Sequence, residues 1–210
     1  MKVLNLYAGI GGNRKLWKNI EVTAVEIDER IAKVYKDNFK NDIVIIGDAH
    51  EYLLKHFKKF DFVWSSPPCQ DNSKMVKATR HDIKKYPDLR MYEEIIFLDN
   101  FFKGKWVVEN VEPYYNSLIK PTAILGRHYF WSNFFISNFN YPQIKNFINK
   151  GTVVESEELK KWIGINYEGN LYYKNNHCPG QVLRNCVHPK LGQHIFWESV
   201  LNSIHGRKLF

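Results

Sequence analysis

The segment Ser65–Gln70 places a cysteine on a stiff turn directly after Phe60–Trp64, a largely apolar run typical of a buried strand. Its two prolines stop the strand, because each fixes φ and neither has an N–H to donate. A cysteine is a strong nucleophile when its thiol is ionised, and the surroundings of such a turn can lower the thiol pKa. A lone cysteine is more often a small core residue, so a nucleophilic role for Cys69 depends on the rest of the chain.

Four further segments carry polar groups or glycines where a predicted strand ends. The predicted strand over residues 2–7 leads into a glycine turn at residues 8–12, and the strand over 22–26 ends in Glu26. The strand over 43–46 is followed by Asp48, and the strand over 106–109 ends in Glu109. Glycines let a ligand approach the backbone, Glu26 can accept both hydroxyls of a ribose, and Asp48 can accept from an adenine amino group. Because ligands bind at the carboxyl ends of strands in an open parallel sheet, one shared site is expected.

The type of cofactor follows from what the glycine turn contains and lacks. It has no Lys-Ser/Thr ending, so ATP is not favoured. A dinucleotide-binding fold could use the same glycines and acid, but it gives Cys69 and Glu109 no role as a pair. A nucleoside cofactor without a polyphosphate fits better, and S-adenosylmethionine is the obvious candidate.

The elements that must position these residues alternate between strand and helix patterns. Beside the strands named above and one at 62–65, helices are expected after the glycine turn through Lys18, from Asp28 to Phe39, over 92–102 and over 191–204. Continuous apolar strands between helices predict an α/β fold with a doubly wound, mostly parallel sheet.

The pattern weakens between residues 138 and 178, where Asn, Tyr, Lys and Gly are prominent. This stretch is expected to form a small inserted lobe with a helix over 156–162. The predicted organisation is therefore a catalytic domain over 1–137, the lobe over 138–178, and a segment over 179–210 that returns to the catalytic domain.

Composition limits the partners and the compartment. The 210 residues include 44% hydrophobic residues, enough for a real core, and carry a net charge of +8, which suggests a polyanionic partner. Three irregularly spaced cysteines argue against a disulfide scaffold and suit a reducing compartment. No membrane-length apolar run or signal peptide is evident, so a cytoplasmic location without membrane or obligate protein partner is expected.

The motifs together resemble those of DNA cytosine-C5 methyltransferases, a family with a Rossmann-like class I methyltransferase fold. Tyr7–Gly12 matches the family's glycine motif with Tyr in place of the commoner Phe, residues 68–70 match Pro-Cys-Gln, and residues 109–111 match Glu-Asn-Val. The motif with two arginines matches partly at residues 125–129, with Leu125 and Tyr129 departing from it. The final Gly-Asn motif resembles residues 184–187, with Arg184 in place of Gly.

This resemblance implies methyl transfer from S-adenosylmethionine to C5 of a flipped-out cytosine in double-stranded DNA. The Cys69 thiolate adds to C6, and Glu109 protonates or hydrogen-bonds N3. Asn110 would hold the loop, and Arg127 would reach the base O2 and the Glu109 carboxylate. The expected cofactor contacts are Tyr7, Ala8, Gly9, Gly11, Gly12, Glu26, Ile27, Asp48, Ala49, Pro67 and Asn185.

DNA contacts are expected from two segments. Residues 71–90 carry an excess of basic residues next to Cys69, and the resemblance implies a mobile catalytic loop there. The 138–178 lobe corresponds to the family's target-recognition region, although an aromatic hairpin that only packs on the lobe explains its tyrosines equally well. The expected DNA contacts are Gln70, Lys74, Lys77, Arg80, Tyr172 and Asn175.

Two alternatives to DNA methylation stay open. Some members of the family act on tRNA, and the short lobe allows that. A DNA-binding relative that no longer turns over is the other, suggested by the departures at Leu125, Tyr129 and Arg184. A zinc site at residues 177–188 is not expected, because their Cys and His residues lack a CxxC spacing.

Overall fold

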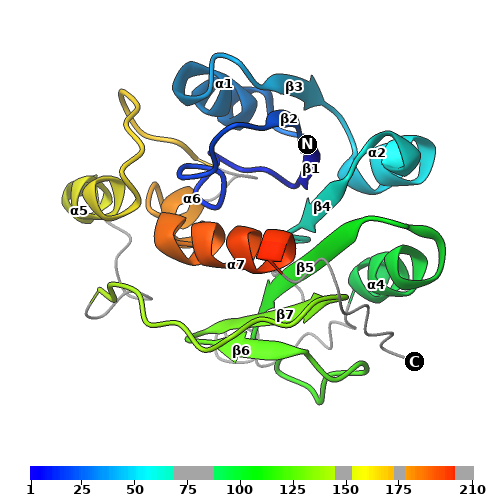
Figure 1. The fold of residues 1–210 in the computed structure, drawn as a ribbon. Helices are drawn as coiled ribbons and strands as arrows, with labels where there is room; N and C mark the ends of the chain where they lie inside the picture. Colours follow the sequence, from blue (N-terminus) through cyan, green and yellow to red (C-terminus); the bar gives the residue numbers. More distant parts are fainter. Residues whose placement is uncertain (69–87, 145–152, 173–177, 202–210) are drawn as a thin grey trace.

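A seven-stranded sheet forms the centre of the computed structural model, which describes residues 1–68, 88–144, 153–172 and 178–201 (Figure 1). The strand order is β3-β2-β1-β4-β5-β7-β6. The strands are β1 Lys2–Leu6, β2 Glu21–Glu26, β3 Ile43–Ile46, β4 Phe62–Ser65, β5 Lys105–Val111, β6 Ala123–Leu125 and β7 His128–Ser132. Strands β1 to β5 are parallel, and β7 is antiparallel to both β5 and β6.

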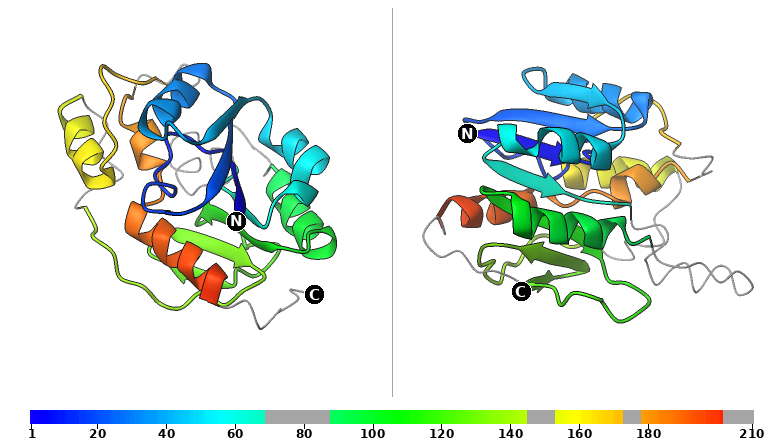
Figure 2. Two further views of the ribbon diagram at one scale, coloured as in Figure 1. Left: turned by 45° about the horizontal axis from the view of Figure 1, so that its top comes forward. Right: turned by 90° about the vertical axis from the view of Figure 1, so that its right-hand side faces the viewer.

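Helices cover both faces of this sheet. They are α1 Glu29–Asn38, α2 Ala49–His56 with the short 3-10 turn η1 Phe57–Lys59, α4 Arg90–Phe101, α5 Val153–Ile163, α6 Gln181–Arg184 and α7 Pro189–Leu201. Helices α2 and α4 lie on one side, while α1 and α7 lie on the other (Figure 2). The predicted doubly wound, mostly parallel α/β fold is confirmed.

Alternating strand residues fill two separate cores, one on each face. On the α7 face, Trp64 and Phe130 pack with Leu191 and other α7 residues. On the α4 face, Trp106 packs with Leu98 and with residues of α2. Each central strand is therefore buried on both sides, which is why its sequence is a continuous apolar run.

The helix expected after the glycine turn through Lys18 was wrong. Residues 11–17 form successive tight turns, in which the N–H of Arg14 bonds the carbonyl of Gly11 and that of Trp17 bonds the carbonyl of Arg14. Two distant contacts hold this path in place of helical bonds. The Arg14 guanidinium pairs with Asp42 at 2.8 Å, and the Trp17 indole N–H donates to the carbonyl of Gly192 at 3.1 Å.

The segment expected as an inserted lobe shares its packing with the sheet domain. Helix α5 contains the expected helix over 156–162, and its Leu159 and Ile163 pack in one cluster with Ile10 and Ile31. The ring of Phe139 stacks on His194 of α7 at 4.4 Å. The described part of 138–178 thus packs on the glycine turn, α1 and α7 through apolar and aromatic contacts. No helix in the described ranges is long and apolar enough to cross a membrane.

Candidate active site

One pocket opens at the carboxyl ends of the parallel strands. Its lining includes most of the residues that the sequence analysis singled out, namely Tyr7, Ala8, Gly9, Gly12, Glu26, Ile27, Asp48, Ala49, Pro67, Glu109, Asn110, Arg127 and Asn185. It also includes Asp88, Arg90 and Met91 from the start of α4, which were not singled out as cofactor contacts. The pocket is therefore built from segments spread from one end of the chain to the other.

The glycine turn after β1 is shaped by close approaches of other segments. A Cβ at Gly12 would lie 2.7 Å from the carbonyl oxygen of Val187 and from the Cβ of Cys186. A Cβ at Gly11, where φ is +86°, would lie 2.3 Å from the Phe39 ring. Gly11 is outside the pocket lining and packs against Phe39 and Tyr35 of the α1 region.

Glu26 at the end of β2 ties this turn to its own strand. Its carboxylate accepts from the backbone N–H groups of Gly9 at 2.9 Å, Ile27 at 2.9 Å and Asp28 at 3.0 Å. Burial raises the pKa of the Glu26 carboxyl, and these three bonds oppose that rise. Glu26 is 7% exposed and lines the pocket, so it presents a buried acceptor there.

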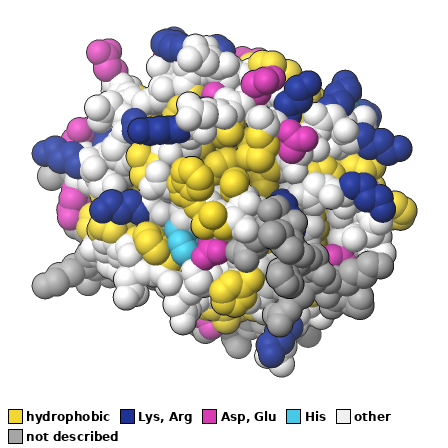
Figure 3. Space-filling view, viewed as in Figure 1, with side chains coloured by type: hydrophobic (Ala, Val, Ile, Leu, Met, Phe, Trp, Pro, Cys, Tyr) yellow, Lys and Arg dark blue, Asp and Glu magenta, His cyan; other side chains and the backbone are white. Residues whose placement is uncertain are grey.

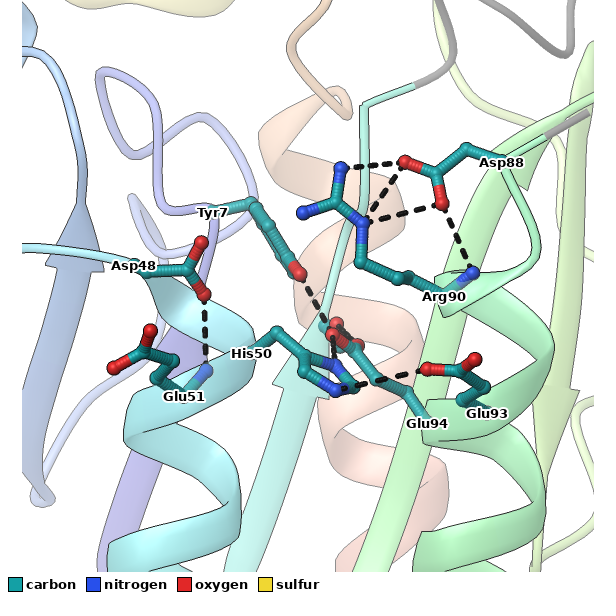
Figure 4. Close-up of polar contacts among 9 residues, drawn as sticks. Tyr7, Asp48, His50, Glu51, Asp88, Arg90, Glu93 and Glu94 are labelled. Carbon is teal, nitrogen blue, oxygen red and sulfur yellow. Dashed lines mark hydrogen bonds and ion pairs between the residues drawn. The ribbon is translucent and has the colours of Figure 1, made fainter.

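A buried carboxylate, Glu94 of α4, joins four elements behind the pocket wall (Figure 4). It accepts from the Tyr7 hydroxyl at 2.6 Å, from the Ser65 hydroxyl at 2.5 Å and from His50 Nδ1 at 3.1 Å. The bond to Glu94 raises the pKa of His50, and burial together with Glu94 raises that of Tyr7. The cluster formed by Tyr7, Ser65, His50 and Glu94, called here the Glu94 cluster, fixes the ends of β1 and β4 relative to α2.

Asp48 stands beside this cluster at the end of β3. Its side chain caps α2 by accepting from the N–H of Glu51 at 2.9 Å, and it lines the pocket. Across the pocket mouth, Arg90 pairs with Asp88 at 2.6 Å, and both line the pocket. The adenine side of the expected site is therefore bordered by charges of both signs.

The turn that follows β4 is held by one side chain of β5 and one of β4 itself. The Asn110 amide donates to the carbonyl of Pro67 at 3.1 Å, and the Trp64 indole donates to the Ser66 hydroxyl at 2.8 Å. Cys69 and Gln70 lie outside the described residues, as do Lys74, Lys77, Arg80 and Asn175. Because β4 and β5 are parallel partners, with Ser65 opposite Val108, the turn that begins at Ser66 lies beside Glu109 and Asn110.

Glu109 is bonded by a residue that the sequence analysis did not single out. His128 Nδ1 lies 2.6 Å from Glu109 Oε1, and both side chains are buried. Arg127, which was expected to reach this carboxylate, donates to the backbone carbonyl of Arg184. Only the alternation of strand residues could have indicated His128, because side chains in a strand point to opposite faces in turn.

The last part of the chain closes the pocket through α6 and the residues after it. Asn185 is exposed and lines the pocket, whereas Cys186 is buried against Gly12. Burial raises the pKa of the Cys186 thiol to about 12, which keeps it protonated and unreactive at neutral pH.

Among the described residues no group of three or more side chains is arranged to hold a metal ion. Tyr172, one of the expected DNA contacts, is described by the structure, and its side chain is 41% exposed.

Among the described residues, Lys and Arg side chains lie at several places around the face viewed in Figure 3. Lys and Arg lie mostly toward its outline, and hydrophobic side chains lie nearer the middle (Figure 3).

Comparison with known proteins gives one family match and several relatives. The model of the C-5 cytosine-specific DNA methylase family matches residues 1–117. A tRNA (cytosine(38)-C(5))-methyltransferase of Spodoptera frugiperda is 30% identical over 131 residues, which are 59% of this chain and 39% of that protein. The chain thus corresponds to about two fifths of that relative's length.

Similar solved structures are those of a Spodoptera frugiperda DNMT2 mutant and of S. pombe Dnmt2. The first is 27% identical, covers 56% of this chain and 37% of its own, and has a TM-score of 0.41. The second is 23% identical, covers 56% of this chain and 38% of its own, and has a TM-score of 0.40. The family match spans more than half of the chain and includes the glycine turn, the segment around Cys69 and Glu109. The chain therefore belongs to the C-5 cytosine-specific DNA methylase family, whose methyl donor is S-adenosylmethionine.

Proposed function

We propose that this protein transfers a methyl group to C5 of a cytosine in double-stranded DNA. The proposal rests on one pocket, which brings residues suited to bind a nucleoside together with residues suited to react with a base. Glu26 and Asp48 line one part of it, while Glu109 and the Pro67-Pro68 turn before Cys69 line another. A methyl donor and a cytosine can therefore meet in one pocket.

The residues at the rim fit S-adenosylmethionine. Ile27 is 57% exposed inside the pocket lining, which offers an apolar surface for an adenine ring. A Cβ at Gly9 would meet no atom within 4 Å, so the turn leaves open space beside Glu26. In this assignment Glu26 holds the ribose hydroxyls and Asp48 the adenine amino group. When bound, the cofactor supplies a methyl group on a sulfonium centre.

The side chains of this protein prepare the base for that transfer. C5 of cytosine is a poor nucleophile until the Cys69 thiolate forms a bond to C6. The electron pair of the C5–C6 double bond then shifts through the ring, and N3 takes a proton from Glu109. Asn110 contributes by holding the carbonyl of Pro67, so that the turn before Cys69 stays beside Glu109. After methylation a water takes the C5 proton, the C6–S bond breaks to return the thiolate, and N3 gives its proton back to Glu109.

A tRNA substrate is the second candidate, and the 30% identical relative favours it because its name specifies a tRNA cytosine. Incubating the protein with labelled S-adenosylmethionine and duplex DNA, tRNA or no acceptor separates the two, followed by mapping of the modified base. We expect 5-methylcytosine in the duplex. Label in tRNA alone would replace the DNA proposal, and label in neither acceptor would favour a relative that binds without turnover.

Replacing Glu26 by alanine tests the cofactor assignment. A charge-assisted bond to the ribose hydroxyls contributes about 1.5–3 kcal/mol. Glu26→Ala should therefore weaken S-adenosylmethionine binding by about tenfold or more, measured by calorimetry. Glu21→Ala is the matched control, because Glu21 is an exposed acid at the other end of the same strand. Equal affinities of the two variants for S-adenosylmethionine would show that the cofactor does not bind at this rim.

The assignment of DNA contacts is tested by two groups of substitutions. Phosphate contacts add affinity on any sequence, so changing Lys74, Lys77 and Arg80 together to alanine should weaken binding to all duplexes and flatten its salt dependence. Base contacts choose the sequence, so Tyr172→Ala or Asn175→Ala should widen the set of methylated sites. Bisulfite sequencing of a methylated plasmid reads the difference. A changed site preference in the first group alone would reverse the assignment.

A further inference from the structure

His128 and Glu109 form a buried pair between two neighbouring strands. In the register of β5 and β7, Glu109 lies opposite Phe130 and Val111 lies opposite His128. Glu109 and His128 are therefore diagonal neighbours on the same face, a separation that long side chains can bridge. The bridge is short, with 2.6 Å between His128 Nδ1 and Glu109 Oε1, and the side chains are 2% and 6% exposed.

The surroundings of His128 keep its ring uncharged. Burial lowers the pKa of His128, and the nearby positive charge of Arg127 lowers it further. Glu109 acts in the opposite direction by raising it, but burial is the larger effect. The ring of Phe130 lies 6.1 Å from the imidazole on the same strand and adds no charge. At neutral pH the imidazole therefore carries one N–H, which can point either to Glu109 or away from it.

We propose that His128 is the positioning residue of Glu109, donating its Nδ1–H to Oε1 so that Oε2 remains for the cytosine. This inference rests on the proposed function, because it assigns Glu109 to the base. Within the part of the chain that the structure describes, His128 is the side chain bonded to Glu109. A fixed Oε1 leaves the carboxyl group one orientation toward the pocket that it lines.

The pair also accounts for the proton in the first step of the reaction. As the Cys69 thiolate bonds to C6, the proton on Oε2 of Glu109 passes to N3 of the base. The negative charge left on the carboxylate then lies beside the Nδ1–H of His128, which stabilises it without gaining or losing a proton. The proton given to N3 is the one that Glu109 lost, so the step balances within the site.

A neutral histidine does something that an arginine cannot. A guanidinium is always charged, and an adjacent positive charge favours the ionised form of a carboxyl group. An arginine bonded to Glu109 would therefore oppose its protonation before the reaction. Arg127, the arginine nearest in sequence, donates instead to the carbonyl of Arg184. A neutral donor adds no further positive charge at Glu109 and supports the carboxylate that the proton transfer leaves.

Two substitutions at the same position separate positioning from packing. In His128→Asn the amide nitrogen can replace Nδ1, whereas His128→Phe keeps the ring and removes the donor. We expect His128→Phe to lower kcat by about 10²-fold with little change in KM, the cost of losing one aligned donor. His128→Asn should retain activity to within about tenfold of the unaltered protein. Tyr129→Phe is the control, because the next side chain on β7 packs on the opposite face.

Equal loss of kcat in the Asn and Phe variants, with normal thermal stability, would overturn the proposal, and so would full activity of His128→Phe. A measurement without turnover keeps this test separate from that of the proposed function. In ¹⁵N NMR of the histidine rings, His128 should be neutral and protonated on Nδ1 at pH 7, and Glu109→Gln should lower its pKa further. A proton on Nε2 or a charged ring at pH 7 would overturn the pairing. If the unaltered protein methylates no acceptor while the Nδ1–H form is present, the proposed function fails and the pairing stands.

Discussion

Replacing Cys69 by serine is expected to lower methyl transfer by about 10⁴-fold or more, since removal of a covalent nucleophile abolishes the route that it opens. A serine hydroxyl is far less ionised than a thiol at neutral pH, so it cannot add to C6 at a useful rate. The turn before it should persist, because the bond from Asn110 to the carbonyl of Pro67 does not involve the thiol. Transfer of labelled methyl groups to DNA measures the loss.

Cys178→Ser is the matched control for this variant. Cys178 is a partly exposed cysteine outside the pocket lining, where its sulfur accepts a hydrogen bond from the Arg184 guanidinium at 3.2 Å, so its replacement should leave the rate unchanged. DNA that carries 5-fluorocytosine gives an independent reading, because C5 then has no proton to lose and the adduct is trapped. Mass spectrometry should find the adduct on the peptide that contains Cys69. An adduct on Cys178 or Cys186, or one that still forms in Cys69→Ser, would disprove the assignment.

Replacing Glu94 by alanine is expected to have the largest effect on stability. Removing one member of a buried charged pair lowers the free energy of unfolding by about 3–5 kcal/mol, because the remaining polar groups lose their partner without gaining water. In the Glu94 cluster this leaves the hydroxyls of Tyr7 and Ser65 and the His50 ring without their acceptor. Since most domains unfold at a cost of about 5–15 kcal/mol, a large share of the total is at stake. Urea unfolding followed by tryptophan fluorescence measures the change.

Glu93→Ala is the control for this prediction, because Glu93 is the preceding residue of α4 and its side chain is 63% exposed. An exposed change of this kind should alter the free energy of unfolding by less than about 0.5 kcal/mol. Glu94→Gln should fall between the two, since an amide oxygen can still accept from one hydroxyl. If Glu94→Ala unfolds at the same urea concentration as Glu93→Ala, the cluster contributes nothing to stability.

The sheet could be predicted because its signal is local. Strands such as β1 and β4 are short apolar runs that stop at glycine or proline, and their ends carried the residues that now line one pocket. The order of those strands in the sheet is not local, yet parallel strands share one carboxyl edge whatever their order. The sequence alone was therefore enough to predict that Glu26, Asp48 and Glu109 lie at one edge of the sheet.

Other features depend on contacts that no local pattern carries. Residues 11–17 form turns instead of a helix because Asp42 and Gly192, far away in sequence, bind Arg14 and Trp17. Glu94 follows an exposed Glu93 and looks like part of a polar helix face, although it is fully buried. The sequence did not indicate His128, because the family's two-arginine motif is defined by residue type, whereas the strand register decides which side chain reaches Glu109.

The close approach of Gly12 to Cys186 and Val187 sets an order of events during synthesis. The segment that supplies one pocket wall leaves the ribosome more than 170 residues after the turn it contacts, as does Gly192, the partner of Trp17. Until then the sheet face under α7, including Trp64 and Phe130, has no cover. Contacts of such long sequence separation form slowly and leave apolar surface open to aggregation. A nascent chain of this protein should therefore depend on chaperone binding until α7 has emerged.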